Sequence, residues 1–113
     1  MILVIGGCAQ GKLDFAREHL GVTAFSDGAL GGENAVYRLH EAVRHGIGKE
    51  DLDAYLARHP DAVLICDEVG CGIVPMERLE REWREQVGRL CCYLAARAER
   101  VYRVFCGIGT RIK

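Results

Sequence analysis

The amino-terminal segment constrains the fold of this chain more than any other part. Residues 1–5 form an uninterrupted apolar run that is followed by two glycines, which is typical of a buried strand in a parallel sheet. Residues 12–20 then mix charged side chains with apolar ones at helical spacing, and Gly21 follows as a stop signal. The order strand, glycine loop, helix predicts the first unit of an α/β domain.

The rest of the chain continues this alternation. Apolar runs predict strands at residues 22–26, 62–66 and 101–106, and helical spacing predicts helices at residues 35–45, 50–59 and 75–100. Glycine-rich composition predicts a loop at residues 27–34 and a closing turn at residues 107–109. Because parallel strands need crossover connections, we expect a layered α/β structure with a mainly parallel sheet.

Length and charge exclude several classes of protein. With 113 residues the chain is expected to form one domain. The chain has 15 lysines and arginines and 16 aspartates and glutamates, which give a net charge of −1. A molecule with this charge has no overall positive field that would attract nucleic acid or an anionic membrane. Glycines and polar residues interrupt the first apolar run, so it matches neither a signal peptide nor a membrane span. We therefore expect a cytoplasmic protein with no nucleic-acid or membrane partner.

The glycine loop has the spacing of a phosphate-binding loop. It consists of Gly6, Gly7, Cys8, Ala9, Gln10, Gly11 and Lys12. Such loops turn their backbone N–H groups toward phosphate oxygens, while the lysine reaches the outer phosphates. The following residue is Leu13 instead of the serine or threonine that would ligate Mg²⁺, so a Mg²⁺ ion would be held weakly. The alternative interpretation is a glycine turn with a solvated lysine.

Two acidic residues follow the predicted central strand. Asp67 and Glu68 come directly after residues 62–66, at the sheet edge where ligands of parallel α/β folds bind. Carboxylates in this position hold Mg²⁺ or activate a nucleophile in phosphoryl-transfer sites. Carboxylates also occur at strand ends because the chain turns into solvent there. Together with the loop, they predict a site with Lys12, Asp67 and Glu68 as catalytic residues and Asp67 as the metal ligand.

The chain contains six cysteines. None lies in a C-x-x-C pair, and several lie in apolar runs, so we interpret them as reduced thiols that pack as small apolar side chains. The alternative is that parallel strands bring Cys8, Cys66, Cys71 and Cys106 together to bind zinc, copper(I) or an iron–sulfur cluster.

The second half of the chain resembles the bifunctional adenosylcobinamide kinase/adenosylcobinamide-phosphate guanylyltransferase family of cobalamin biosynthesis. The resemblance runs from Glu68 to Lys113 and includes residues 68–75 (EVGCGIVP), 81–84 (REWR) and 107–113 (GIGTRIK). Residues 1–12 are similar to the family's first strand and phosphate loop. The resemblance implies a P-loop NTPase-like three-layer fold, shortened here, with one nucleotide-binding domain over residues 1–113.

The resemblance also carries expectations about ligands and assembly. It implies ATP or GTP at residues 6–13, cobinamide as the acceptor, and a homo-oligomer, namely a trimer. This chain departs from the family pattern at Leu13, where the family has serine, and at Cys91, where it has asparagine. It also lacks most of the segment that carries the guanylylated histidine. We expect His40, His45 and His59 to be surface histidines instead.

Two functional hypotheses follow. In the first, the protein is a kinase in which Lys12 neutralises the γ-phosphate and Asp67 or Glu68 holds Mg²⁺ or accepts the hydroxyl proton. In the second, it is a catalytically impaired nucleotide-binding or regulatory relative that lacks the guanylylated histidine. Leu13 favours the second, and the intact lysine and acidic pair favour the first.

Overall fold

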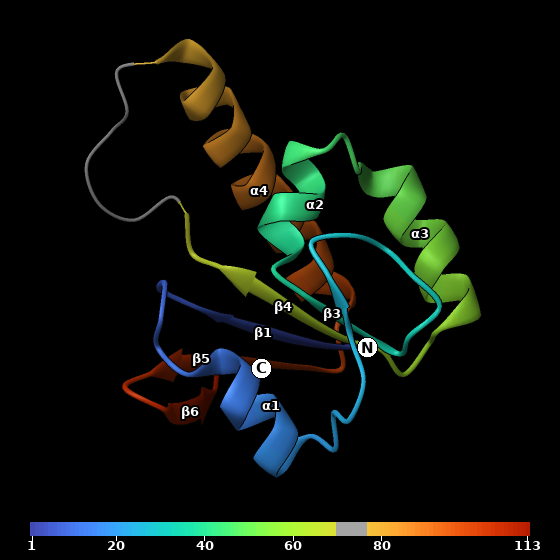
Figure 1. Ribbon diagram of the computed structural model, residues 1–113, viewed down its shortest axis with the longest axis vertical. Coiled ribbons are helices and arrows are strands. Elements are labelled where there is room, and N and C mark those ends of the chain that lie inside the picture. Colours follow the sequence, from blue (N-terminus) through green and yellow to red (C-terminus); the bar gives the residue numbers. More distant parts are fainter. Residues whose placement is uncertain (70–76) are drawn as a thin grey trace.

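The computed structural model describes residues 1–69 and 77–113 and contains helices and strands in alternation (Figure 1). The strands are β1 (Ile2–Gly6), β2 (Ser26–Asp27), β3 (Ala35–Tyr37), β4 (Val63–Asp67), β5 (Arg100–Phe105) and β6 (Ile108–Arg111). The helices are α1 (Lys12–His19), α2 (Leu39–Arg44), α3 (Lys49–Arg58) and α4 (Arg78–Arg97).

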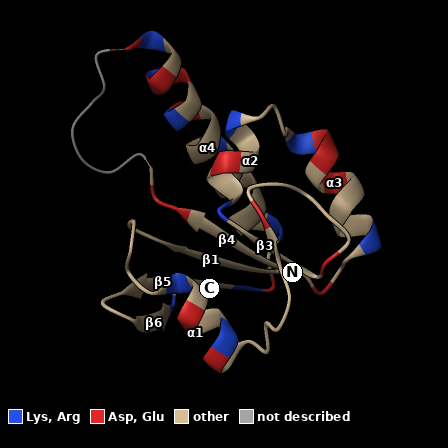
Figure 2. Cartoon of the chain, in the orientation of Figure 1, with Lys and Arg blue, Asp and Glu red and all other residues tan. Residues whose placement is uncertain are grey.

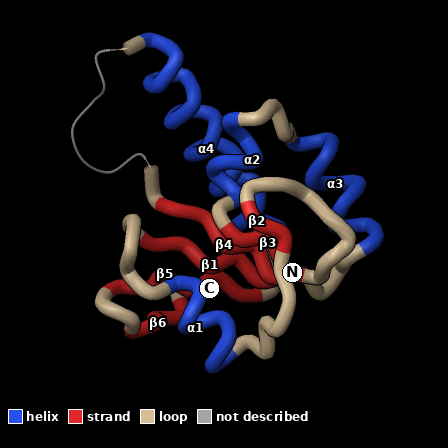
Figure 3. Tube along the Cα trace, in the orientation of Figure 1, coloured by secondary structure: helices blue, strands red, loops and turns tan. Residues whose placement is uncertain are grey.

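The strands form one sheet in the order β2-β3-β4-β1-β5-β6 (Figure 3). All neighbouring strands pair in parallel except β5 and β6, which are antiparallel. The first strand, β1, lies between β4 and β5 with Gly6 opposite Asp67. The mainly parallel α/β sheet predicted from the sequence is confirmed.

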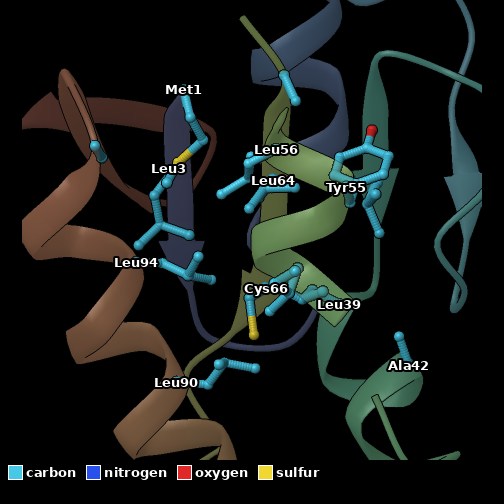
Figure 4. Packing of buried hydrophobic residues seen from close by; sticks show 14 of the residues in the cluster. Met1, Leu3, Leu39, Ala42, Tyr55, Leu56, Leu64, Cys66, Leu90 and Leu94 are labelled. Atoms are coloured by element: carbon cyan, nitrogen blue, oxygen red, sulfur yellow. The ribbon is translucent and has the colours of Figure 1, made fainter. Parts of the chain in front are cut away.

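Helices cover both faces of the sheet, so the fold has the three layers expected. On one face, Phe15 and Ala16 of α1 pack against Val4 and Ile65. On the other, the larger core joins Leu3 and Leu64 to apolar residues of α2, α3 and α4 (Figure 4). Successive residues of β1 and β4 thus face opposite layers, which explains why their sequences are apolar without interruption.

Two elements before β4 differ from the prediction. The helix expected at residues 35–45 begins only at Leu39, because Ala35–Tyr37 form β3 beside β4, and Val36 and Tyr37 are residue types that favour strands. Arg38 separates the two elements with a left-handed backbone (φ 52°). The strand expected at residues 22–26 is wrong in extent, since only Ser26–Asp27 pairs in the sheet. The helix expected at residues 50–59 is confirmed as α3.

The carboxyl-terminal hairpin was only half predicted. β5 matches the strand expected at residues 101–106, and a turn follows it as expected, but the turn lies at residues 106–107 and residues 108–111 form an additional edge strand. The turn consists of Cys106 (φ 51°) and Gly107 (φ 76°), a pair of positive φ angles typical of a type I′ hairpin.

The long helix α4 begins at Arg78 in the structure, and the Pro75 and Met76 of the prediction lie outside the described residues. Val87, Leu90 and Leu94 are the buried residues of this helix. Leu79 is 72% exposed. Figure 2 shows that the first turns of α4, which extend away from the sheet, carry charged residues of both signs. Across residues 1–69 and 77–113, no helix is long and apolar enough to span a membrane.

Candidate functional site

The loop between β1 and α1 is shaped by glycines in close contact with the C-terminal hairpin. A Cβ atom at Gly6 would lie 2.5 Å from the carbonyl oxygen of Val104, and one at Gly11 would lie 3.1 Å from the Cα of Gly107. Gly11 also has a left-handed backbone (φ 88°) where α1 begins. No described side chain caps this helix terminus, so its first N–H groups are open toward a ligand.

Lys12 is buried at the start of α1, with 5% of its surface exposed. Its Nζ donates to the carbonyl oxygen of Gly7 at 2.6 Å and forms an ion pair with Oδ1 of Asp67 at 2.7 Å. An ammonium group has three N–H donors, so one remains for a further acceptor. The solvated lysine of the alternative interpretation is therefore wrong, and the structure brings Lys12 and Asp67 together as the sequence predicted.

His40 is the site residue that the sequence interpretation missed. It was expected at the surface but is buried, since α2 packs against β4 and places its ring beside Asp67. Its Nδ1 accepts the backbone N–H of Asp67 at 3.1 Å, and its Nε2 lies 3.5 Å from Asp67 Oδ2. The neutral ring therefore carries its proton on Nε2, facing the carboxylate. The other two histidines that were expected at the surface are His45 and His59. His45 is exposed, whereas His59 is half-buried and stacks on Tyr55.

Burial is the main cause that lowers the pKa of His40 below its ordinary value. A base with a lowered folded-state pKa binds fewer protons than the unfolded chain, so stability falls as pH drops below about 6.5 toward the folded-state pKa. In His40→Asn, the asparagine Oδ1 is expected to replace Nδ1 as acceptor without titrating. Denaturant unfolding between pH 5 and 8 should therefore show a smaller loss of stability at low pH in the variant. Equal pH dependence in His40→Asn and the wild type would contradict this, with the exposed His45→Asn as the control.

Glu68 does not join Lys12 in this cluster. Its carboxylate binds the Arg103 guanidinium through two contacts, Nε to Oε1 at 3.0 Å and Nη2 to Oε2 at 3.1 Å. Its backbone N–H donates to the carbonyl oxygen of Gly6 at 2.8 Å, so β4 continues alongside the start of the glycine loop. The ion pair occupies the Glu68 carboxylate and leaves Asp67 as the acid in contact with Lys12.

A cavity of about 410 Å³ lies between the glycine loop and α4. It is lined by Gly7, Cys8, Asp67, Glu68, Val69, Glu80 and Arg84. Its volume is in the range of small-molecule sites. A compound in this cavity would therefore contact both the loop and the Asp67 carboxylate.

The tip of the glycine loop is held by the β5–β6 turn. The side-chain Oε1 of Gln10 accepts a hydrogen bond from the Cys106 N–H at 2.8 Å, and the backbone carbonyl oxygen of Gln10 accepts one from the Gly107 N–H at 2.7 Å. Figure 1 shows the loop between β1 and α1 beside this hairpin. The glycine loop, the Asp67 end of β4 and Gly107 therefore meet at the carboxyl ends of the parallel strands.

Leu13 is half-buried and packs against the core beneath α1. We expect Leu13→Ser to lower the free energy of unfolding by about 1–2 kcal/mol, because packing is lost, and to strengthen the effect of Mg²⁺ on nucleotide affinity. Melting curves and titrations with and without Mg²⁺ would measure both effects. Leu20→Ser, on the same core cluster, should lower stability but leave the Mg²⁺ effect unchanged. Strong Mg²⁺ enhancement already present in the wild type would contradict the weak-metal prediction.

The described cysteines are all free thiols. Cys66 and Cys91 contact each other with their sulfurs 3.7 Å apart, whereas Cys8, Cys92 and Cys106 are exposed. The hydrogen bond with Cys91 and the burial of the Cys66 side chain raise the pKa of the Cys66 thiol. Within the described part of the chain, no group of three or more His, Cys, Asp or Glu residues could hold a metal, and Cys71 lies outside it.

The donor set is suited to an anion and poorly suited to a protein-held Mg²⁺. A helix N-terminus, a glycine loop and a buried lysine all favour phosphate. Asp67 could supply one carboxylate oxygen, but it is already bound to Lys12, and Leu13 supplies no oxygen. Strand order, layering and the glycine loop before α1 together define an α/β fold of the P-loop NTPase type.

The chain belongs to the cobinamide kinase / cobinamide phosphate guanyltransferase family, whose model matches residues 33–112. One relative is the bifunctional adenosylcobalamin biosynthesis protein CobU of Salmonella typhimurium (strain LT2), which is 40% identical to this chain over 89 residues. The aligned region covers 75% of this chain and 49% of the relative. A second relative is the protein of the same name from Escherichia coli (strain K12), which is 43% identical to this chain over 77 residues. That aligned region covers 66% of this chain and 42% of the relative. The chain thus spans about half the length of these curated relatives.

Proposed function

We propose that the chain binds ATP or GTP at Gly6–Leu13 and transfers the γ-phosphoryl group to a cobinamide, as the kinase part of the family name describes. The observation that carries this proposal is the buried Lys12 ammonium, held between Gly7 and Asp67 at the start of α1. Its remaining N–H group is directed to a phosphate oxygen when the nucleotide binds. Residues 1–113 act in this proposal as a single nucleotide-binding domain.

The roles of the side chains follow from their contacts. Backbone N–H groups of residues 7–13 bind the phosphates, and Lys12 neutralises charge on the γ-phosphate. The acceptor hydroxyl lies in the cavity beside Asp67, which accepts its proton while the oxygen bonds to the γ-phosphorus. The bond from the γ-phosphorus to the bridging oxygen breaks, and the nucleoside diphosphate leaves. Arg103 holds Glu68 in place at the mouth of this cavity.

Further parts of the proposal concern the metal, assembly and location. Mg²⁺ accompanies the nucleotide phosphates and is retained weakly, because Leu13 supplies no oxygen and the Asp67 carboxylate is bound to Lys12. The protein acts as a homotrimer in the cytoplasm, where nucleoside triphosphates are available, without nucleic-acid or membrane partners. These statements rest on the family resemblance and on the charge balance of the chain.

The test is transfer of label from γ-labelled ATP or GTP to adenosylcobinamide. We expect labelled adenosylcobinamide phosphate, and we expect Asp67→Asn to slow its formation about 100-fold or more while nucleotide still binds. Asp61→Asn, an exposed aspartate just before β4, is the matched control. Nucleotide binding without transfer would instead identify the catalytically impaired relative.

The same assay with α-labelled GTP tests the guanylyl transfer of the longer relatives. We expect the denatured protein to retain no acid-labile label, because the buried His40 is engaged with Asp67 and no residue of this chain matches the family's nucleophile. Retained label that is lost on substituting His40 or His45 would contradict this proposal.

A further inference from the structure

Two thiols meet between β4 and α4, and the proposed reaction uses neither of them. Cys66, in β4, is 1% exposed, and Cys91, in α4, is half-buried and packs against the same core cluster. Their sulfurs lie 3.7 Å apart, although the two residues are separated by 25 positions of sequence. In Figure 4 the Cys66 sulfur points toward Leu90, the neighbour of Cys91 in α4. The fold therefore holds two distant cysteines in direct contact.

The pair lies where a disulfide needs little rearrangement. A disulfide brings two sulfurs to about 2 Å, and rotation of the side chains supplies part of this approach. β4 pairs with β1 on one side and with β3 on the other, so its backbone is fixed. α4 packs on one face of the sheet through its side chains (Figure 1). A small shift of this helix toward β4 therefore supplies the rest of the approach.

The two thiols differ in access and in reactivity. Cys91 is partly exposed, so a small oxidant reaches it before it reaches Cys66. The hydrogen bond with Cys66 lowers the pKa of the Cys91 thiol, which favours the thiolate, the form that reacts with peroxides. Cys66 lies within contact distance of the Cys91 sulfur and is placed to attack it once it is oxidised.

We propose that Cys66 and Cys91 form a reversible disulfide when the protein meets a peroxide. The Cys91 thiolate attacks one oxygen of hydrogen peroxide, the O–O bond breaks, and the products are a sulfenic acid and hydroxide, which takes up the proton that Cys91 lost. The Cys66 sulfur then bonds to the Cys91 sulfur, and the hydroxyl group leaves with the Cys66 proton as water. The two thiols together lose two electrons, and one peroxide is reduced to two water molecules. A dithiol such as dithiothreitol reverses the change and is itself oxidised to a disulfide.

The disulfide acts on the candidate site from outside it. Cys66 directly precedes Asp67, and its Sγ lies 3.5 Å from the Asp67 carbonyl oxygen. α4 carries Glu80 and Arg84, which line the cavity beside Asp67. Oxidation therefore fastens one wall of this cavity to the strand that carries Asp67. The disulfide does not depend on the proposed function, and the family resemblance does not indicate it, because the family pattern has asparagine at position 91.

Peptide mapping tests the pairing directly. The full chain is treated with an equimolar amount of hydrogen peroxide, and its free thiols are alkylated before digestion with trypsin. We expect peptides 59–78 and 90–97 to be joined through Cys66 and Cys91, as located by fragmentation, with the remaining cysteines alkylated. Treatment with dithiothreitol before alkylation should remove the link.

The two peptides also contain Cys71 and Cys92, which provide matched controls. Cys91→Ser should abolish the link, whereas Cys71→Ser and Cys92→Ser should keep it. A wild type without the link, a link that persists in Cys91→Ser, or fragments that place the bond on Cys71 or Cys92 would each overturn the proposal.

Melting curves test whether the bond fits the folded protein. The oxidised wild type should melt about 5 °C or more above the reduced protein, because the cross-link closes a loop of about 25 residues in the unfolded chain. Cys92→Ser should show the same difference. Cys91→Ser should show none, and its melting curve under reducing conditions verifies that the variant is folded. An equal or lower melting temperature of the oxidised wild type would show that the bond forms only by disturbing the core, and would overturn the proposal.

Discussion

Replacing Lys12 by methionine is expected to weaken nucleotide binding about 10- to 100-fold. Methionine keeps most of the buried stem but removes the charged donor, and a hydrogen bond to a charged group contributes about 1.5–3 kcal/mol. Calorimetric titration of both proteins with ATP and GTP measures the effect. Lys49→Met, which removes an exposed lysine at the start of α3, should bind as the wild type does.

The Lys12 variant also has a readout that does not depend on nucleotide. Asp67 loses its 2.7 Å ion-pair partner, so the melting temperature in the absence of ligand should fall and thereby report the structural part of the change. Equal nucleotide affinity in the wild type and a folded Lys12→Met would remove the phosphate-loop assignment.

Gly6→Ala is expected to lower the free energy of unfolding by about 3 kcal/mol or more. The added methyl would lie 2.5 Å from the Val104 carbonyl oxygen, and this contact joins the central strand β1 to β5, where neither backbone can move freely. Denaturant unfolding measures the loss. Gly7→Ala is the matched control, since its Cβ would meet only the Gln10 side chain at 3.6 Å and should cost less than about 1 kcal/mol. Similar losses in the two variants would show that the close approach at Gly6 is not the cause.

The central part of the sheet was predictable because its signal is local. Strands β1 and β4 are buried on both faces, so their sequences are apolar throughout, and the glycines after β1 mark the loop. β3 was missed because Val36, Leu39 and Val43 also fit helical spacing, and three residues are too few to decide between the patterns. The edge strand β6 was missed because exposed residues with a central glycine have no strand pattern.

The candidate site was predictable where one segment defines it and not where distant segments meet. The spacing of the glycine loop and the acidic pair predicted Lys12 and Asp67. His40 contacts Asp67 across 27 positions of sequence, and Arg103 contacts Glu68 across 35. Nothing in the sequence around these two residues distinguishes them from solvated surface residues, because their partners depend on how α2 and β5 pack beside β4.

The central place of β1 has a consequence for how the protein is made. β1 is synthesised first, yet its partners are β4, with Ile2 opposite Val63, and β5, with Ile2 opposite Arg100. Contacts between such distant segments form slowly, so a nascent chain exposes the apolar β1 until β4 and β5 have emerged from the ribosome. The glycine loop obtains its hydrogen bonds to Cys106 and Gly107 later still. A chain truncated before residue 106 would therefore lack both hydrogen bonds that hold the tip of the glycine loop.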